Sequence, residues 1–146
     1  MTQPLPEGEG AARCMRIAMQ PRARSRPDQI DYINAHGTST PIGDVCETKA
    51  IKQALGESAS KAMISSTKSM TGHLRWARPA GSSSRLAPWR SNTGSCLPRS
   101  TSTTPILNAI STTSRTPRAR RKSGVMTNSF GFGGHNATLI ASEFSG

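Results

Sequence analysis

The sequence predicts an α/β fold, because helical and strand-like patterns alternate along its first half and a short strand returns near its end. Two segments carry this prediction most directly. Residues 44–55 place apolar side chains at helical spacing, whereas residues 62–67 form a short apolar run that suits a buried strand. With 146 residues, the chain has room for one domain and one core.

The first elements are a helix and a strand. Residues 8–20 carry apolar residues at the spacing of a helix face and meet the proline- and arginine-rich run Pro21–Pro27, which predicts a loop. Residues 29–35 alternate apolar and polar side chains, and the small and turn-forming residues after them end a strand. His36 is therefore expected just past a strand end.

The next helix has the clearest end signals. Asp44 is its expected N-cap, Glu47 stands three residues later as in a capping box, and Gly56 is the expected C-cap. The apolar strand that follows leads into residues 68–74, which read as a loop. A second histidine, His73, is therefore also expected after a strand end.

Residues 75–124 break every periodic pattern. Ser, Thr, Arg and Pro fill 31 of these 50 positions, which predicts disorder or loose packing. Order is expected to resume with a glycine-rich turn over residues 128–136 and a short apolar strand over residues 137–141.

The net charge of +11 would by itself suggest a basic nucleic-acid-binding module. Its distribution argues against that alternative, because residues 75–124 contain nine Arg, one Lys and no acid. Trp76 and Trp89 lie in this segment, but no helix face or stacking pattern organises them. The charge belongs to one segment, and nucleic acid is not the expected partner.

The remaining composition favours a cytoplasmic protein without a metal site. No apolar run approaches the roughly eighteen residues that span a bilayer, and the N-terminus carries acids where a signal peptide needs bases. Cys14, Cys46 and Cys96 form no CxxC pattern and are expected to be free thiols. The three histidines, at positions 36, 73 and 135, lack metal-ligand spacing.

Three blocks resemble the β-ketoacyl-acyl carrier protein synthases, in order and in approximate spacing. They are NAHGTSTPIGD from Asn34 to Asp44, SSTKSMTGHL from Ser65 to Leu74, and NSFGFGG from Asn128 to Gly134. The wording of the first block is closer to the type II synthases of fatty-acid synthesis than to polyketide ketosynthases, which usually read AHGTGT. The resemblance covers only the last part of a family chain.

The resemblance implies a thiolase-like α/β fold, of which this chain would be the C-terminal half, and a homodimer. The implied activity is decarboxylative Claisen condensation of an acyl-enzyme with malonyl-acyl carrier protein, so acyl carrier protein is the expected partner. The family uses no metal or organic cofactor for this chemistry. The expected domain is a single C-terminal synthase domain over residues 1–146.

The resemblance also assigns catalytic residues. His36 and His73 would stabilise the enolate through their ring N–H groups, and Lys68 with Glu47 would orient them through charge-assisted hydrogen bonds. Without the motifs, these would be ordinary loop histidines and solvated surface charges. His135 replaces the more familiar threonine of the family and is given no role.

Two further regions would bind substrate. Thr38 and Thr40 resemble the pair that hydrogen-bonds the pantetheine arm. Phe132 resembles the residue whose backbone N–H completes the oxyanion hole and whose side chain gates the acyl site, with glycines at 131, 133 and 134 giving the turn unusual dihedrals. Without the resemblance, these glycines and Phe132 would indicate only a hairpin turn.

The chain departs from the family in its cysteines. The reactive Cys lies upstream of these motifs in the family, and none of the three cysteines here has its context; Cys46, beside Glu47, reads as a small core residue. The chain alone is therefore expected to be inactive. A cysteine-lacking ketosynthase-like partner of a polyketide system is the enzyme-class alternative.

The second departure is the segment 75–124, which we interpret as translated out of frame. In one shifted register, synonymous codons for residues 75–81 can read L-G-A-A-G, and those for residues 105–121 can read N-P-E-R-D-L-D-Y-V-P-H-T-A-R. Both strings resemble the family at the right places. A GC-rich gene read out of frame would also explain the excess of arginine.

Overall fold

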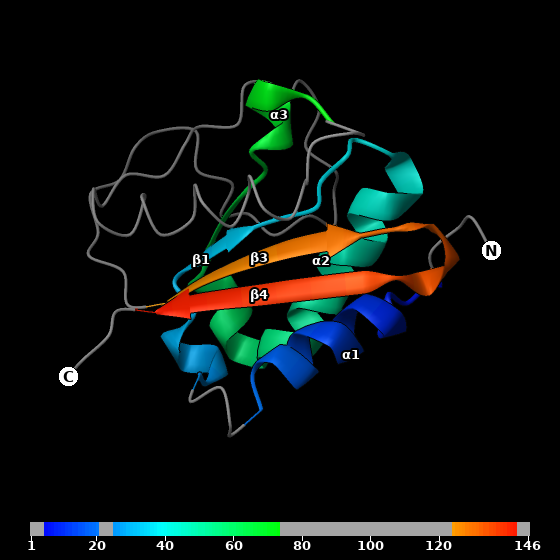
Figure 1. Cartoon of the computed structure of the whole chain (residues 1–146). Helices are drawn as coiled ribbons and strands as arrows, with labels where there is room; N and C mark the ends of the chain where they lie inside the picture. The colour runs from blue at the N-terminus through cyan, green and yellow to red at the C-terminus, as the bar shows by residue number, and fades with distance from the viewer. Residues whose placement is uncertain (1–4, 21–24, 74–123, 143–146) are drawn as a thin grey trace.

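The computed structural model describes residues 5–20, 25–73 and 124–142, and Figure 1 gives their arrangement. The elements in chain order are α1 (Glu9–Ala18), η2 (Pro27–Gln29), β1 (Tyr32–Asn34), α2 (Pro41–Leu55), η3 (Gly56–Ser60), β2 (Met63–Ser65), α3 (Lys68–Thr71), β3 (Gly124–Phe130), η4 (Phe132–Gly134) and β4 (Asn136–Ser142).

One mixed sheet organises these elements, with the strand order β2-β1-β3-β4. β1 runs parallel to both neighbours, pairing Ile33 with Ile64 on one side and with Met126 on the other. β3 and β4 form an antiparallel hairpin over seven residue pairs. Helices inserted between parallel strands are the mark of an α/β fold, so the predicted class is confirmed.

Helices α1 and α2 lie side by side on one face of the sheet (Figure 1). The main core fills the space between them and the strands. Its members with no more than 2% exposure include Ala12 and Met15 from α1, Ile33 from β1, Ala50 and Ile51 from α2, and Met126 from β3.

The opposite face of the sheet is packed differently. Because side chains alternate along a strand, Tyr32 and Val125 point away from the helices, and Met63 packs against them. Further along the same face, the Asn34 side-chain amide donates a hydrogen bond to the Thr127 hydroxyl at 3.2 Å. This face therefore becomes polar toward the carboxyl ends of β1 and β3.

The helix expected from Asp44 begins three residues earlier. Pro41 occupies the first helical turn, where its fixed φ is favourable, and Thr40 is the extended N-cap residue. The Asp44 amide already donates to the Thr40 carbonyl at 3.0 Å, so Asp44 lies inside the first turn rather than at the cap. The predicted C-cap, Gly56, is confirmed.

Two other expectations were wrong. Part of the loop expected over residues 68–74 is the helical turn α3, which ends at Thr71 and is followed by the C-cap Gly72 with φ 75°. The strand β3 was not expected at all, because its start lies in the segment expected to be disordered and its end in the expected glycine-rich turn. Its residues Gly124–Asn128 are buried, and the three from Val125 to Thr127 pair with β1 on one side and β4 on the other, so tertiary contacts rather than local periodicity define this strand.

Several expectations fall outside the part of the chain that the structure describes. They concern disorder over residues 75–123, the thiol of Cys96 and the two tryptophans. Within the described ranges, no helix is both long and apolar enough to cross a bilayer.

Candidate active site

His36 and His73 approach each other at the carboxyl ends of β1 and β2. His36 lies two residues beyond β1, and His73 follows the helical turn α3 that begins three residues beyond β2. The two imidazole centroids are 5.8 Å apart, with the rings nearly perpendicular at 87°. Since neighbouring parallel strands end at the same edge of a sheet, the two loops deliver both rings to one place.

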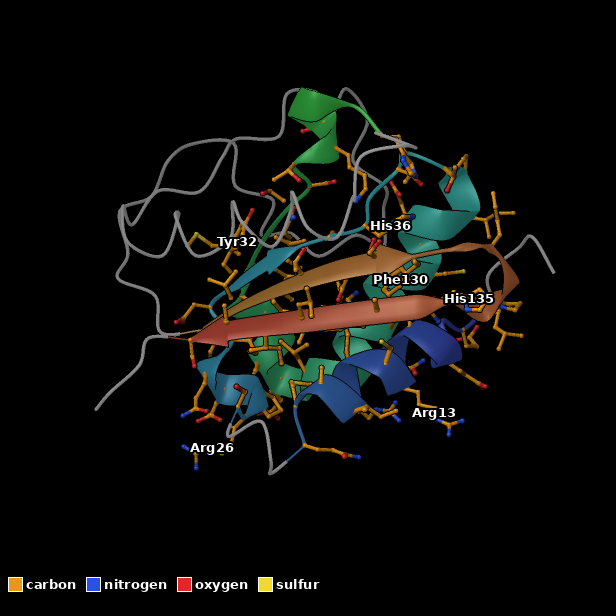
Figure 2. All side chains as sticks on the ribbon, viewed as in Figure 1. Arg13, Arg26, Tyr32, His36, Phe130 and His135 are labelled. Atoms are coloured by element: carbon orange, nitrogen blue, oxygen red, sulfur yellow. The ribbon has the colours of Figure 1, made fainter. Side chains whose placement is uncertain are left out.

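The His36 ring is fixed by the end of β3. The backbone N–H of Phe130 donates to its Nδ1 at 3.3 Å, and the Phe130 ring lies 5.5 Å from the imidazole (Figure 2). A nitrogen that accepts a hydrogen bond carries no proton, so the neutral ring must hold its proton on Nε2. His36 therefore presents an Nε2–H donor.

His36 stays neutral well below pH 7. Burial, together with the smaller effects of the charge of Lys68 and of His73, lowers the pKa of His36 from its ordinary 6.5 to about 4. A neutral imidazole is the form that the Phe130 contact requires. The electrostatics and the hydrogen bond thus select the same protonation state.

Glu47 holds the backbone of the His36 loop. This carboxylate is 6% exposed on α2, and its two oxygens accept from the N–H groups of His36 at 2.8 Å and Gly37 at 2.9 Å. Burial raises the pKa of Glu47, whereas these hydrogen bonds, one from Asn128 and the charge of Lys68 act in the opposite direction. Glu47 thus contacts the backbone of His36 and not its ring.

The tight loop depends on a glycine at position 37. Gly37 has φ 37°, and a Cβ placed there would lie 2.9 Å from the Cβ of Ser66. The Ser66 hydroxyl donates to the Gly37 carbonyl at 3.2 Å, so the loops after β1 and β2 touch at this point. Any larger residue would push the two histidine loops apart.

Lys68 is half-buried at the start of α3. Burial lowers the pKa of Lys68, and the charge of Glu47 opposes that effect. The ion pairs of the described ranges include Arg26–Asp28 and Lys49–Glu7 but not Lys68–Glu47, so Lys68 and Glu47 interact through space rather than by direct contact. Lys68 also acts on His36 in this way.

Thr38 and Thr40 flank a strained residue. Ser39 has φ 63°, the one positive value recorded for a non-glycine residue in the described ranges. Such strain costs of order 1–3 kcal/mol and tends to gather at functional loops. Thr38 is half-buried and Thr40 exposed, which leaves both beside the His36 loop.

Phe132 lies two residues beyond Phe130, and its side chain is exposed. It begins η4 in the hairpin turn between β3 and β4, and its side chain is 79% exposed. Gly133 and Gly134 have φ values of 77° and 81°, as expected, but Gly131 has an ordinary φ of −117°. The exposed His135 lies in the same turn, away from His36 (Figure 2).

Two asparagines that sequence reasoning left without roles support the site. Asn34 accepts from the Thr67 N–H at 3.0 Å and so connects the end of β1 to the loop after β2. Asn128 donates to Glu47 at 3.3 Å. Both open a sequence block that resembles the synthases, and a buried asparagine at a strand end was the available signal.

Neither a metal centre nor an activated thiol is assembled by the described residues. No group of three His, Cys, Asp or Glu side chains lies together there. Cys14 is half-buried on α1, and Cys46, buried on α2, donates weakly to the Pro6 carbonyl at 3.4 Å. Both cysteines belong to the helix layer rather than to the histidine cluster.

Comparison with known sequences agrees with this geometry. Residues 1–86 match the family described as beta-ketoacyl synthase, C-terminal domain. A 3-oxoacyl-[acyl-carrier-protein] synthase 2 of Staphylococcus aureus is 41% identical over 99% of this chain, and its counterpart in Coxiella burnetii is 43% identical over 98%. This chain spans about a third of these relatives, 34% of each.

Solved structures with the same fold include polyketide and other synthases. One is a type II polyketide ketosynthase in complex with its acyl carrier protein and bound to the hexaketide, with TM-score 0.86 and 28% identity over 99% of this chain and 35% of that one. Another is a beta-ketoacyl synthase from Burkholderia phymatum, with TM-score 0.75 and 31% identity over 99% of this chain and 34% of that one. The thiolase-like architecture expected from the resemblance is thereby confirmed.

Proposed function

Because this chain belongs to the β-ketoacyl synthase family, we propose that it is the C-terminal part of a 3-oxoacyl-acyl carrier protein synthase that elongates fatty acyl chains. The observation that carries the proposal is the pair of histidines at the strand ends. The His36 and His73 rings lie 5.8 Å apart, and the Phe130 amide leaves the Nε2–H of His36 free to donate.

This arrangement suits decarboxylation of a malonyl thioester. When the bond between the malonyl carboxylate and C2 breaks, CO₂ leaves and the electron pair forms an enolate with negative charge on the thioester oxygen. Hydrogen-bond donors preplaced at that oxygen stabilise the charge, an effect worth several kcal/mol in comparable sites. His36 is one donor and His73 is the proposed second.

Condensation then follows at a second thioester. The enolate carbon attacks the carbonyl of an acyl group held on a cysteine, the new carbon–carbon bond forms, and the thiolate leaves. Cys14 and Cys46 lie in the helix layer, and Cys96 lacks the sequence context of the family's reactive cysteine, so the nucleophile would be supplied by protein outside this sequence. We therefore expect the chain alone to be inactive.

Glu47 and Lys68 have positioning roles in this proposal. Glu47 holds the two backbone amides on which the His36 ring depends, and the charge of Lys68 favours the neutral form of His36 and the ionised form of Glu47. Thr38 and Thr40, beside this loop, are the proposed hydrogen-bonding pair for the pantetheine arm. The amide of Phe132 is the proposed oxyanion donor, and its exposed side chain the proposed gate.

The proposed substrates are acyl- and malonyl-acyl carrier protein. A related ketosynthase is seen in complex with its acyl carrier protein, which supports this partner. A homodimer and a cytoplasmic location belong to the same proposal. The curated relatives, at 41–43% identity, favour fatty-acid elongation over a role as the cysteine-lacking partner of a polyketide system.

We further propose that residues 1–146 belong to one synthase domain in which 75–124 is read out of frame. Resequencing codons 70 to 130 and the region upstream tests this directly. A restored frame reading L-G-A-A-G, with a cysteine motif upstream, supports the proposal. An unchanged sequence would mean a chain without condensing activity.

The activity itself is tested in the complete synthase that the frame-restored gene would encode. Formation of 3-oxoacyl-acyl carrier protein would be followed for the unsubstituted protein, His36→Ala and the matched control His135→Ala. We expect His36→Ala to lower turnover at least a hundredfold, roughly the worth of one positioned donor. Equal activity in all three proteins would overturn the proposed role of His36.

A further inference from the structure

Asn128 is a polar residue on the apolar face of the sheet. It lies on β3 two residues after Met126, so its side chain shares the face that packs against α1 and α2, and it is 1% exposed. Burying an amide without partners costs roughly 1–3 kcal/mol by mutational measures. The Asn128 amide is therefore expected to have hydrogen-bond partners at both its oxygen and its NH₂ group.

Each end of the Asn128 amide is engaged. Its Oδ1 accepts from the hydroxyl of Thr138, the residue opposite it on β4, at 3.0 Å. Its Nδ2 donates to the Glu47 Oε1 at 3.3 Å and lies 3.5 Å from the sulfur of Met15. Since only the oxygen can accept from Thr138, this contact turns the NH₂ group toward Glu47.

The same Glu47 oxygen accepts from the His36 backbone. A continuous path of hydrogen bonds thus runs from Thr138 on β4, through Asn128 on β3 and Glu47 on α2, to the loop that carries His36. β3 touches His36 a second time, two residues further on, where the Phe130 N–H donates to its ring. One strand therefore governs both the backbone and the ring of this histidine.

We infer that Asn128 is a positioning residue: its amide, oriented by Thr138, holds the Glu47 carboxylate where that carboxylate fixes the His36 backbone. Its meaning for catalysis rests on the function proposed above. The hydrogen bonds of Asn128 can be tested on the 146-residue chain without an assay of catalytic activity.

The test reads the amide protons of His36 and Gly37 by NMR as a function of pH, because both are bound to Glu47 and report its ionisation. In Asn128→Ala the carboxylate loses one donor, so we expect the midpoint of both signals to rise by about one pH unit. Lys68, the charged group that acts on Glu47, remains in the variant.

Asn34→Ala is the matched control. Asn34 is also 1% exposed, on the neighbouring strand, but it bonds Thr67 and Thr127 instead of Glu47. We expect it to leave the midpoint in place. An unchanged midpoint in Asn128→Ala, or an equal rise in both variants, would overturn the inference, because a merely structural asparagine would behave in that way.

Thr138→Val keeps the inference testable if Asn128→Ala does not fold. It removes only the donor that orients the amide, on the half-buried edge strand, and should raise the same midpoint by a smaller amount. No change would overturn the orienting role of Thr138 and, where Asn128→Ala is unfolded, the inference as a whole. Failure of the condensation assay would leave these results unaffected.

Discussion

The loop after β1 and the turn after β3 both carry glycine-containing motifs of the same family, yet they differ in how many contacts the rest of the fold makes with them. The His36 loop is held by Glu47, Ser66 and the end of β3, whereas Phe132 in the β3–β4 turn is 79% exposed. The first region is built by contacts within this chain. In the second region the described residues fix the backbone of the turn, but they do not cover the Phe132 side chain.

The difference teaches which parts of a site a partial chain can organise by itself. Preorganised donors need fixed backbone, and the His36 loop has it. Substitutions in the His36 loop should therefore lower the free energy of unfolding much more than substitutions in the β3–β4 turn.

Removing the Glu47 carboxylate should have the largest effect. Glu47→Ala leaves the N–H groups of His36 and Gly37 without their acceptor and opens a cavity, so we expect a loss of about 3–4 kcal/mol in the free energy of unfolding. The matched change at the exposed Glu57 should stay within about 0.5 kcal/mol. Urea unfolding measures both, and equal losses would contradict a special role for Glu47.

Glycine-to-alanine changes compare the two regions with one chemical alteration. Gly37→Ala adds a methyl group 2.9 Å from the Ser66 Cβ at φ 37°, so strain and collision together should cost about 2–3 kcal/mol. Gly134→Ala meets nothing within 4 Å and should cost only the strain of φ 81°, about 1 kcal/mol. Equal losses on thermal unfolding would contradict the difference between loop and turn.

The pH dependence of the first region follows from His36. Its pKa is lowered to about 4 from the ordinary 6.5, so the unfolded chain binds the proton more readily. The contribution of the neutral, buried His36 ring to the free energy of unfolding is therefore fully present above about pH 6.5, and it declines as the pH falls toward 4. An NMR titration of the imidazole protons should show a midpoint near pH 4, and a midpoint at its ordinary value would contradict the burial of the ring.

Lys68→Met sharpens the same measurement. Removing the positive charge should raise the pKa of His36, by less than burial lowers it, because burial is the larger cause. Lys61→Met, at an exposed lysine after η3, should leave the titration unchanged. If both variants shift the midpoint equally, general charge rather than the position of Lys68 would be responsible.

Phe132→Ala should have the smallest effect. A side chain this exposed contributes little to the folded chain, so we expect a change within about 0.5 kcal/mol. Phe130→Ala, at the half-buried end of β3 beside the His36 ring, should cost more. A large loss at Phe132 would mean that the turn is anchored by contacts that the described residues do not supply.

The sequence predicted most of the helix-and-strand order, because α1, α2, β1 and β2 show local periodicity or end signals. It failed at β3, whose sequence GVMTNSF mixes small and polar residues without alternation. Such a strand is specified by its two neighbours, since Met126 pairs with Ile33 on one side and Ile140 on the other. No local signal could report those partners.

Motif resemblance could name the members of the candidate site, but it could not predict the hydrogen bonds that connect them. Motif resemblance named His36, His73, Lys68 and Glu47, and the fold brings the two rings together. That Glu47 binds backbone amides, and that Asn128 ties it to β3, depends on side-chain directions between elements far apart in the chain. Sequence spacing carries no information about those directions.

The parallel pairing of β1 with β3 has a consequence for assembly. Asn34 and Thr127 meet although 93 positions of sequence separate them, so this pairing brings two distant parts of the chain together. The β3–β4 hairpin is in effect an intramolecular ligand for the edge of β1, and a peptide of residues 124–142 could complement a chain that ends at residue 73.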